Sequence, residues 1–252
     1  MSAKPHWVGG IHAVEALLNS APERILSASV TQALVVDEDG LYAQIRSMGV
    51  SVQTVDKDWL LKRVGHSQHQ GIALQVRPKP ELNESDLRRL LSTLPEKSDW
   101  LFLVLDQVQD PHNLGACLRT ALAAGVDGVL LPKDRAAPIS SVVHKVASGA
   151  ADLVPVFRVT NLVRAVNHLQ AQGVWVIGTS DAAEQVLYDC DLKPSLALMM
   201  GAEGRGLRQL SQASCDQLVA LPMSPTQVSS LNVSVATGVC LYEAVRQRRL
   251  TN

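Results

Sequence analysis

The sequence lacks any cysteine arrangement that would indicate disulfide bonds or a zinc site. Its 252 residues include four cysteines, and no two of them form a C-x-x-C pair or stand at metal-ligand spacing from a histidine. Disulfide frameworks and structural zinc sites both depend on such spacings. We therefore expect no bound metal, and we interpret the four cysteines as small buried hydrophobic residues: Cys117, Cys190, Cys215 and Cys240.

Long apolar runs are also lacking. The first residues carry no basic stretch followed by an apolar segment and a cleavage site, and no apolar segment approaches the length that spans a bilayer. Hydrophobic residues nevertheless make up 46% of the chain, which is enough for a sizeable core. We expect a globular, cytoplasmic protein with no membrane partner.

An excess of positive charge, which RNA-binding proteins often show, is missing as well. The net charge is −1, and this argues mildly against a nucleic-acid partner. Local patches matter more than the total, however. Each basic cluster fits either an RNA-binding surface or a solvated face near a helix end: Lys62, Arg63, Arg77 and Lys79; Arg88 and Arg89; Arg246, Arg248 and Arg249.

Changes in composition divide the chain into two α/β parts. We predict a small domain over residues 1–76, a linker over 77–98 that is rich in proline and charge and holds one short amphipathic helix, and a larger domain over 99–252. Within the small domain, periodicity predicts helices and strands in alternation: helix Ile11–Leu18, strand Ala33–Val36, helix Leu41–Met48, strand Val50–Val55, helix Trp59–Val64 and strand Gly71–Val76.

The larger domain contains six strands that are apolar almost throughout, as in a parallel sheet covered on both faces. They are Trp100–Leu105, Gly128–Leu131, Val154–Val159, Val174–Ile177, Leu196–Met200 and Gln217–Leu221. Ligands bind beyond the carboxyl ends of such strands. We therefore expect the unusual loops that follow the first, fourth, fifth and sixth strands to converge on one site.

Two charged residues in these loops and helices lack an obvious local partner. Arg119 is the only formally charged residue between Pro111 and Val126, so it either faces water or meets a partner from another segment. Glu203 directly follows an apolar strand, in a glycine-rich stretch that also fits a simple turn. The glycine spacing in that stretch, G-x-x-G-x-G, matches neither a P-loop nor the dinucleotide-binding fingerprint. Because no G-x-G-x-x-G follows a strand elsewhere, the sequence excludes a dinucleotide-dependent dehydrogenase.

The segment Ser229–Asn232 precedes a long helical stretch, where Ser or Asn is an ordinary N-cap. A helix N-terminus at this place also offers unpaired N–H groups to a ligand. The sequence alone leaves both interpretations open.

Three segments together resemble the signature motifs of the SpoU/TrmH family of RNA ribose 2′-O-methyltransferases, within the SPOUT superfamily. They are Asp106–Thr120, Met200–Leu207 and Leu221–Ala236, in the family's order. Near the N-terminus, Gly10–Val14 and His69–Ile72 are similar to the substrate-binding domain of one branch, which methylates a guanosine ribose in the peptidyl-transferase region of 23S ribosomal RNA.

The resemblance implies an L30e-like RNA-binding domain, a catalytic α/β-knot domain with a trefoil knot, S-adenosylmethionine as cofactor, and a homodimer. It also implies site residues. Cofactor contacts are expected at Gly201, Leu221, Leu231, Thr179 and Met223; catalytic roles at Asn113, Arg119, Glu203, Ser230 and Asn232; and RNA contacts at Lys62, Arg63 and His69. The alternatives are a transfer-RNA guanosine or ribosomal-RNA adenosine methyltransferase of the same family, or an RNA-binding module without catalysis.

The expected chemistry assigns a role to each polar motif residue. The resemblance implies that the matching Arg acts as the base, but a guanidinium is almost never deprotonated in proteins, so we expect Arg119 to hold a phosphate or the developing alkoxide. Base character of Arg119 and the group that accepts the hydroxyl proton stay open. Glu203 would orient Arg119 or the ribose, and Asn113 and Asn232 would fix the ribose and the loops. The apolar stretch Val233–Ala244 has few charges and would pack across a two-fold axis in the homodimer.

Overall fold

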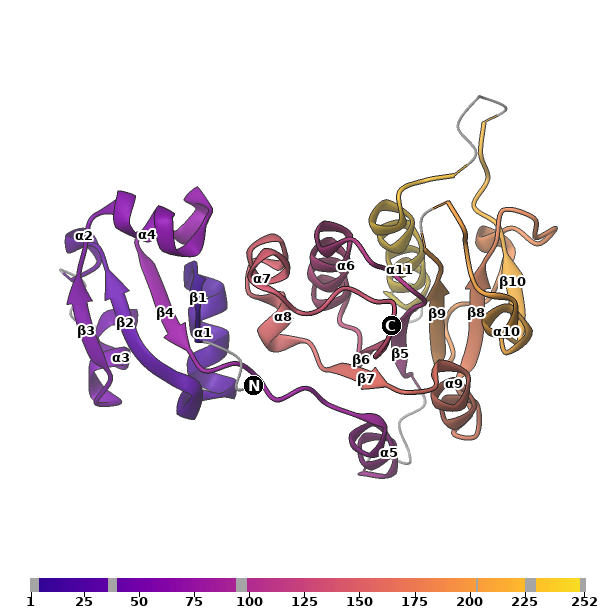
Figure 1. Ribbon diagram of the computed structural model, residues 1–252, viewed down its shortest axis with the longest axis horizontal. Helices are drawn as coiled ribbons and strands as arrows, with labels where there is room; N and C mark the ends of the chain where they lie inside the picture. The colour runs from indigo at the N-terminus through magenta and orange to yellow at the C-terminus, as the bar shows by residue number, and fades with distance from the viewer. Residues whose placement is uncertain (1–4, 36–39, 94–98, 203, 225–229, 250–252) are drawn as a thin grey trace. The chain divides into compact units, whose positions relative to one another are not determined.

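The computed structural model describes residues 5–35, 40–93, 99–202, 204–224 and 230–249 (Figure 1). The chain forms two compact units, Met1–Pro80 together with Ser141–Leu153, and Glu81–Ser140 together with Val154–Asn252. A segment from the middle of the chain therefore packs with the N-terminal residues. In the described part, no helix is both long enough and apolar enough to cross a membrane.

The first unit is built on a four-stranded mixed sheet with the order β1-β4-β2-β3. The central strand β4 pairs antiparallel with both β1 and β2, and β2 pairs parallel with β3. Its strands are β1 His6–Gly9, β2 Ile25–Val30, β3 Ser51–Thr54 and β4 Ile72–Val76. Its helices are α1 Ile11–Ser20, α2 Gln32–Val35, α3 Leu41–Ser47, α4 Lys57–Val64, α7 Ser141–Ala147 and α8 Ala150–Leu153, with 3-10 turns η1 Pro22–Arg24 and η2 Ser67–His69.

One predicted element of this unit is wrong. The strand expected at Ala33–Val36 is instead the short helix α2, Gln32–Val35, within the described residues. The strand of the sheet in this region is β2, which ends at Val30. The chain turns directly after it, since the N–H of Leu34 donates to the carbonyl of Thr31 at 3.0 Å. A four-residue apolar run fits either a strand or a helix turn, so its periodicity does not distinguish them. The other five predicted elements are present.

The two N-terminal motifs meet between β1 and β4. The N–H of Gly10 donates to the carbonyl of Ile72 at 3.2 Å, and the N–H of Ile11 donates to the side-chain oxygen of Gln70 at 3.0 Å. Gly10 has a φ of +105°, a value that favours glycine. The Gln70 side chain therefore satisfies one of the unpaired N–H groups that begin α1.

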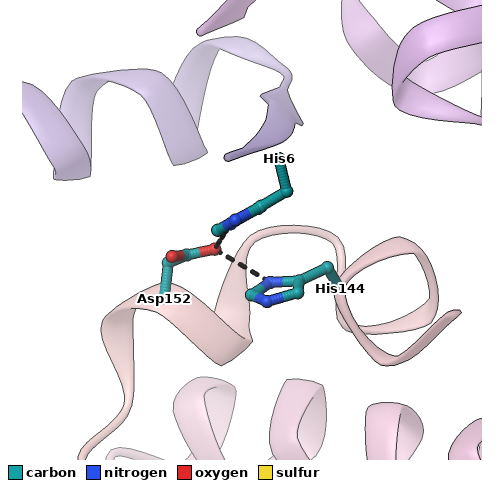
Figure 2. A group of neighbouring side chains, drawn as sticks. All are labelled: His6, His144 and Asp152. Carbon is teal, nitrogen blue, oxygen red and sulfur yellow. Dashed lines mark hydrogen bonds and ion pairs between the residues drawn. The ribbon is translucent and has the colours of Figure 1, made fainter. Parts of the chain in front are cut away.

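A buried ion cluster fastens α7 and α8 to the rest of the first unit (Figure 2). Asp152 is 3% exposed; His6 Nε2 lies 2.8 Å and His144 Nδ1 3.1 Å from its Oδ2, while Arg24 bonds to its Oδ1. Burial alone would raise the pKa of the Asp152 carboxyl, but hydrogen bonds from His144 and His6 hold that pKa well below its usual value. The cluster thus ties residues far apart in the sequence.

We expect Asp152→Asn to lower the free energy of unfolding by about 3 kcal/mol, because it leaves buried cations without their carboxylate. The folded-state pKa of Asp152 is depressed. Its stabilisation is therefore complete above the unfolded-state pKa of about 3.9 and is lost as the pH falls below that value. Urea denaturation of the full chain between pH 3 and 8 measures both effects.

Asp191→Asn is the matched control, because Asp191 is 61% exposed and lies 4.0 Å from Lys193. Its removal should change the stability by less than about 0.5 kcal/mol. An Asp152→Asn protein as stable as the control at pH 7 would contradict the anchoring role.

The second unit is built on a six-stranded sheet whose neighbouring strands are all parallel, in the order β10-β8-β9-β5-β6-β7. Its strands are β5 Leu101–Leu105, β6 Gly128–Pro132, β7 Val156–Val159, β8 Trp175–Thr179, β9 Leu196–Met200 and β10 Gln217–Val219. Its helices are α5 Glu84–Thr93, α6 Pro111–Ala124, α9 Leu162–Gln170, α10 Gln209–Ala213 and α11 Val233–Arg249, with the 3-10 turn η3 Leu187–Asp189. The predicted α/β fold class with a parallel sheet is confirmed.

Helices cover both faces of this sheet, which explains why its strands are apolar throughout. Helices α6 and α11 pack against each other, and α11 contacts β9. Helices α5 and α9 contact each other and the strands β6, β7 and β8, and α10 packs against α9. Residues Leu101–Leu105 and Leu196–Met200, which form the paired central strands, are all buried.

The cysteines are free thiols in this fold. Cys117, Cys190 and Cys240 are buried, and Cys215 is half-buried. Burial raises the pKa of Cys117 to about 11 and that of Cys240 to about 12, so neither thiol is a nucleophile at neutral pH. Their role as small hydrophobic residues follows from this.

Candidate active site

A cavity of about 260 Å³ lies at the carboxyl ends of β8, β9 and β10. Its described lining comes from residues 179–181 at the end of β8, 200–202 and 204–207 around the end of β9, Gln212 of α10, three residues within 219–223, and four residues within 230–236 at the start of α11. This is the edge at which open parallel sheets bind ligands. All five expected cofactor residues belong to the lining: Thr179, Gly201, Leu221, Met223 and Leu231.

The loop after β9 closes tightly on itself at the cavity. The N–H of Ala202 donates to the carbonyl of Gly206 at 3.1 Å, and the N–H of Gly206 donates back at 2.8 Å. A Cβ atom at Gly201 would lie 2.1 Å from the carbonyl carbon of Gly206 and 2.3 Å from the nitrogen of Leu207. Only glycine at Gly201 permits this approach of backbone to backbone.

Two of the expected catalytic residues form a direct hydrogen bond. The Asn232 side-chain N–H donates to Oδ1 of Asn113 at 2.9 Å, although the two residues are 119 positions apart. Asn232 also caps α11, because its Oδ1 accepts from the backbone N–H of Ser234 at 2.9 Å. Asn232 therefore caps α11 and also bonds to Asn113. Asn113 is nearly buried in the first turn of α6, where Asp110 caps the helix.

Arg119 lies apart from this pair and from the described lining of the cavity. It is exposed on α6, six positions after Asn113, which turns it to another side of the helix. Of the other expected catalytic residues, Ser230 lines the cavity, while Glu203 lies outside the described residues. Within the described residues, the chain thus brings Asn113 together with Asn232 and places Ser230 at the cavity, whereas Arg119 is exposed on α6.

The expected RNA-facing residues occupy different environments. Lys62 and Arg63 are exposed on α4, with the Arg63 guanidinium 5.1 Å from the centre of the Trp59 ring. His69 is 5% exposed, and its Nδ1 accepts from the N–H of Gly71 at 3.1 Å. Burial of the ring and its bond to the N–H of Gly71 favour a structural role for His69.

One group of side chains in the described part has the composition of a metal site, namely His6, His144 and Asp152 (Figure 2). Arg24 already bonds to the Asp152 carboxylate, however, and Lys79 is close enough for Arg24 to affect it. Burial lowers the pKa of Lys79, and the charge of Arg24 lowers it further. Two nearby cations disfavour a divalent ion, so we interpret the group as an internal ion cluster.

The sequence interpretation missed an ion pair beside the cavity. Asp106, at the end of β5, is fully buried and bonds to Arg208, which follows the loop of β9. The two residues are 102 positions apart, so no local pattern joins them. The sequence gives one signal for the pair: Asp106 directly follows a predicted strand, and Arg208 directly follows the loop after another predicted strand.

Two solved structures resemble the whole chain. An AdoMet-bound rRNA methyltransferase from Sinorhizobium meliloti aligns with a TM-score of 0.72 and 26% identity, over 96% of this chain and 87% of that chain. The SpoU methyltransferase AviRb from Streptomyces viridochromogenes, solved with AdoMet, aligns with a TM-score of 0.73, over 98% and 92% of the two chains. At 21% identity, AviRb supports the fold alone.

We expect Gly201→Ala to weaken binding of S-adenosylmethionine by on the order of tenfold or more, because the added methyl displaces backbone that lines the cavity. Gly238→Ala is the matched control: its Cβ would meet only the Thr120 methyl, at 3.9 Å, in the interior of α11. Isothermal titration calorimetry compares the two variants. Equal affinities for the cofactor would contradict the position assigned to Gly201.

Family profiles match both halves of the chain. The profile described as SpoU rRNA Methylase family matches residues 100–242, and the profile for RNA 2′-O ribose methyltransferase substrate binding matches residues 7–82. A curated relative from Shewanella oneidensis, the 23S rRNA (guanosine-2′-O-)-methyltransferase RlmB, is 52% identical over 98% of this chain and 99% of its own length. With the parallel sheet and the cavity at its carboxyl edge, these matches show that the chain belongs to the SpoU rRNA methylase family.

Proposed function

We propose that this protein transfers a methyl group from S-adenosylmethionine to the ribose 2′-hydroxyl of a guanosine in 23S ribosomal RNA. The observation that carries the proposal is the match, over nearly full length, to a relative with that activity. The substrate-binding profile over residues 7–82 supports an RNA substrate. We further propose that the protein works in the cytoplasm, where ribosomal RNA is assembled.

The cavity fits the cofactor in its chemistry. Leu221, Met223 and Leu231 supply apolar surface, while Thr179 and the backbone around Gly201 supply polar groups. Small-molecule sites commonly combine an apolar lining with a few such polar groups. We propose that these five residues hold the cofactor, which supplies an electrophilic methyl group on a sulfonium when bound.

The chain's own residues would align the nucleophile. Asn113 and Asn232, held together by their hydrogen bond, present amide groups that suit a ribose hydroxyl. The Arg119 guanidinium keeps its charge and would hold a phosphate or the alkoxide that develops at the 2′-oxygen. Ser230, at the cavity, and Glu203 complete the proposed catalytic set. Alignment of this kind supplies much of the acceleration that methyl transfer needs.

We propose that α4 contributes to the grip on RNA through Lys62 and Arg63. Both are exposed, and the Arg63 guanidinium beside the Trp59 ring forms a combined cationic and aromatic surface. Cations neutralise phosphates, and aromatic faces stack on unpaired bases. His69 would act by shaping the adjacent turn, because its ring is buried.

Arg119→Ala should abolish methyl transfer to 23S ribosomal RNA while changing the affinity for S-adenosylmethionine by less than about threefold, because Arg119 is outside the cavity lining. Arg119→Lys keeps the charge and should retain part of the rate. Single-turnover assays and cofactor titrations on the same preparations separate the two effects. Near wild-type transfer by Arg119→Ala would refute its catalytic role.

We also propose a homodimer whose interface includes α6 and α11 and completes the site. Arg119 and Leu122 stand three positions apart on α6, so they share an exposed side of that helix. Val235 and Tyr242 are also exposed, seven positions apart on α11, which packs against α6. An apolar face next to Arg119 suits a two-fold contact, through which Arg119 of the partner subunit would approach the ribose beside the cavity without contacting the cofactor.

Mixing Arg119→Ala with Gly201→Ala tests this arrangement, at a concentration of S-adenosylmethionine too low to occupy the Gly201→Ala cavity. Arg119→Ala leaves the cavity intact, and Gly201→Ala leaves Arg119 intact. After subunit exchange, each mixed dimer contains one site with both parts functional, so activity should return to about a quarter of the wild-type value. No recovery from a mixture that forms mixed dimers would contradict a shared site, as would a fully active monomer in analytical ultracentrifugation.

The trefoil knot stays a prediction of family membership. The proposed knot involves the chain around the loops after β9 and β10, and residues 203 and 225–229 of those loops lie outside the described residues. The placement of β9 between β5 and β8 supports it, because the chain returns to the middle of the sheet after it has formed one edge.

A further inference from the structure

A buried ion pair joins the loop that lines the cavity to the end of the central strand. Asp106 directly follows β5 and has no exposed surface. The Nε of Arg208 donates to its Oδ1 at 2.8 Å, and Nη2 lies 2.7 Å from the same oxygen. The backbone N–H of Arg208 donates to Oδ2 at 3.1 Å. Both carboxylate oxygens thus have a partner in Arg208.

The pair closes a loop that is already fixed at its other end. The loop begins at Met200, the last residue of β9, which pairs with β5. There the N–H of Asp106 donates to the carbonyl of Met200 at 2.8 Å. The loop then folds back on Gly201 through the hydrogen bonds between Ala202 and Gly206. Arg208 directly follows Leu207, the last residue of this loop that lines the cavity. The Asp106 carboxylate therefore fixes the point at which the loop leaves the cavity.

Asp106 is also the first residue of the connection from β5 to α6, the helix that carries the proposed catalytic residues Asn113 and Arg119. Gln107 follows Asp106 with a φ of +64°, a backbone conformation that is uncommon outside glycine. Three residues later Asp110 caps α6, accepting from the N–H of His112 at 3.1 Å and that of Asn113 at 3.3 Å. Asp106 is thus bonded to the cavity loop and is near in sequence to Asn113.

We propose that Asp106 and Arg208 are positioning residues that hold the cavity loop in register with α6, so that bound S-adenosylmethionine is aligned with the ribose. The alignment rests on the proposed function, whereas the effect on cofactor binding is measured without RNA. Charge-assisted forked bonds to a carboxylate are strong and directional, and this one is shielded on the carboxylate side. If the bonds between the Arg208 guanidinium and Asp106 are lost, the end of the loop after β9 is no longer held, although no group that lines the cavity has been removed.

Arg208→Gln in the full chain should weaken S-adenosylmethionine binding by about tenfold or more, and should also lower the melting temperature, because the fully buried Asp106 carboxylate loses its cation. Arg208→Lys keeps the charge and should recover part of that affinity. Calorimetric titration with the cofactor alone measures both. A Gln variant that melts earlier yet binds the cofactor with wild-type affinity would overturn the proposal, as would a Lys variant no better than Gln.

Arg164→Gln is the matched control. Arg164 is 57% exposed and forms a similar forked pair with Glu84, at 2.6 and 2.8 Å, between α9 and α5 and away from the cavity lining. This control should bind the cofactor with wild-type affinity. A loss equal to that of Arg208→Gln would show that any surface ion pair has this effect and would overturn the assignment.

A double-mutant cycle with Asp106→Asn tests whether the two residues act through each other. If they do, the variant with both substitutions should bind the cofactor no more weakly than the worse single variant. If the two losses of cofactor affinity multiply in the double variant, the residues act independently and the proposal is contradicted. Failure of the wild type to methylate ribosomal RNA would instead overturn the proposed function and leave the effects on cofactor binding in place.

Discussion

The parallel pairing of β5 with β9 is the constraint on which the candidate site depends. These strands lie in the middle of the sheet, with Leu105 opposite Met200, so the two motif loops that follow them start side by side. β8 and β10 then add their carboxyl ends at the same edge. A cavity forms there because the segments that follow β8, β9 and β10 all leave the sheet at one edge, where the start of α11 also lies.

The polar residues of the family motifs divide between two tasks in this arrangement. Ser230 lines the cavity together with apolar side chains and backbone, whereas Asn113 and Asn232 connect α6 to α11 through their hydrogen bond. Arg119 faces outward on α6, next to exposed apolar surface. The proposed dimer, with its shared site, would reconcile the exposed position of Arg119 with its proposed catalytic role. The Asp106–Arg208 pair connects the two tasks, because it joins the cavity loop to the strand that leads into α6.

Local patterns predicted the strands of the larger domain well, because a covered parallel sheet requires apolar residues at consecutive positions. The same reasoning failed where the signal was short. It missed β1 and β2, since β1 spans four residues and β2 contains Ser27 and Ser29, and it assigned Ala33–Val36 to a strand. Short runs do not distinguish a strand from a helix turn.

Contacts between distant residues could not be predicted from sequence. Arg24 and Asp152 are 128 positions apart, yet their ion pair places α8 in the first unit. His69 stands among cations and polar residues that suggest a surface, although its ring is buried. In these cases the outcome depends on which segments the fold brings together. The motif resemblance, by contrast, selected cavity residues such as Gly201 and Leu231 directly.

The chemical identity of the methylated nucleoside tests the account most directly. Unmethylated 23S ribosomal RNA would be incubated with the full chain and S-adenosylmethionine, digested to nucleosides and analysed by mass spectrometry, with the position mapped on the intact RNA. The account predicts 2′-O-methylguanosine at a single position. Methylation of a base, methylation of an adenosine ribose, or transfer to transfer RNA but not to 23S ribosomal RNA would contradict it.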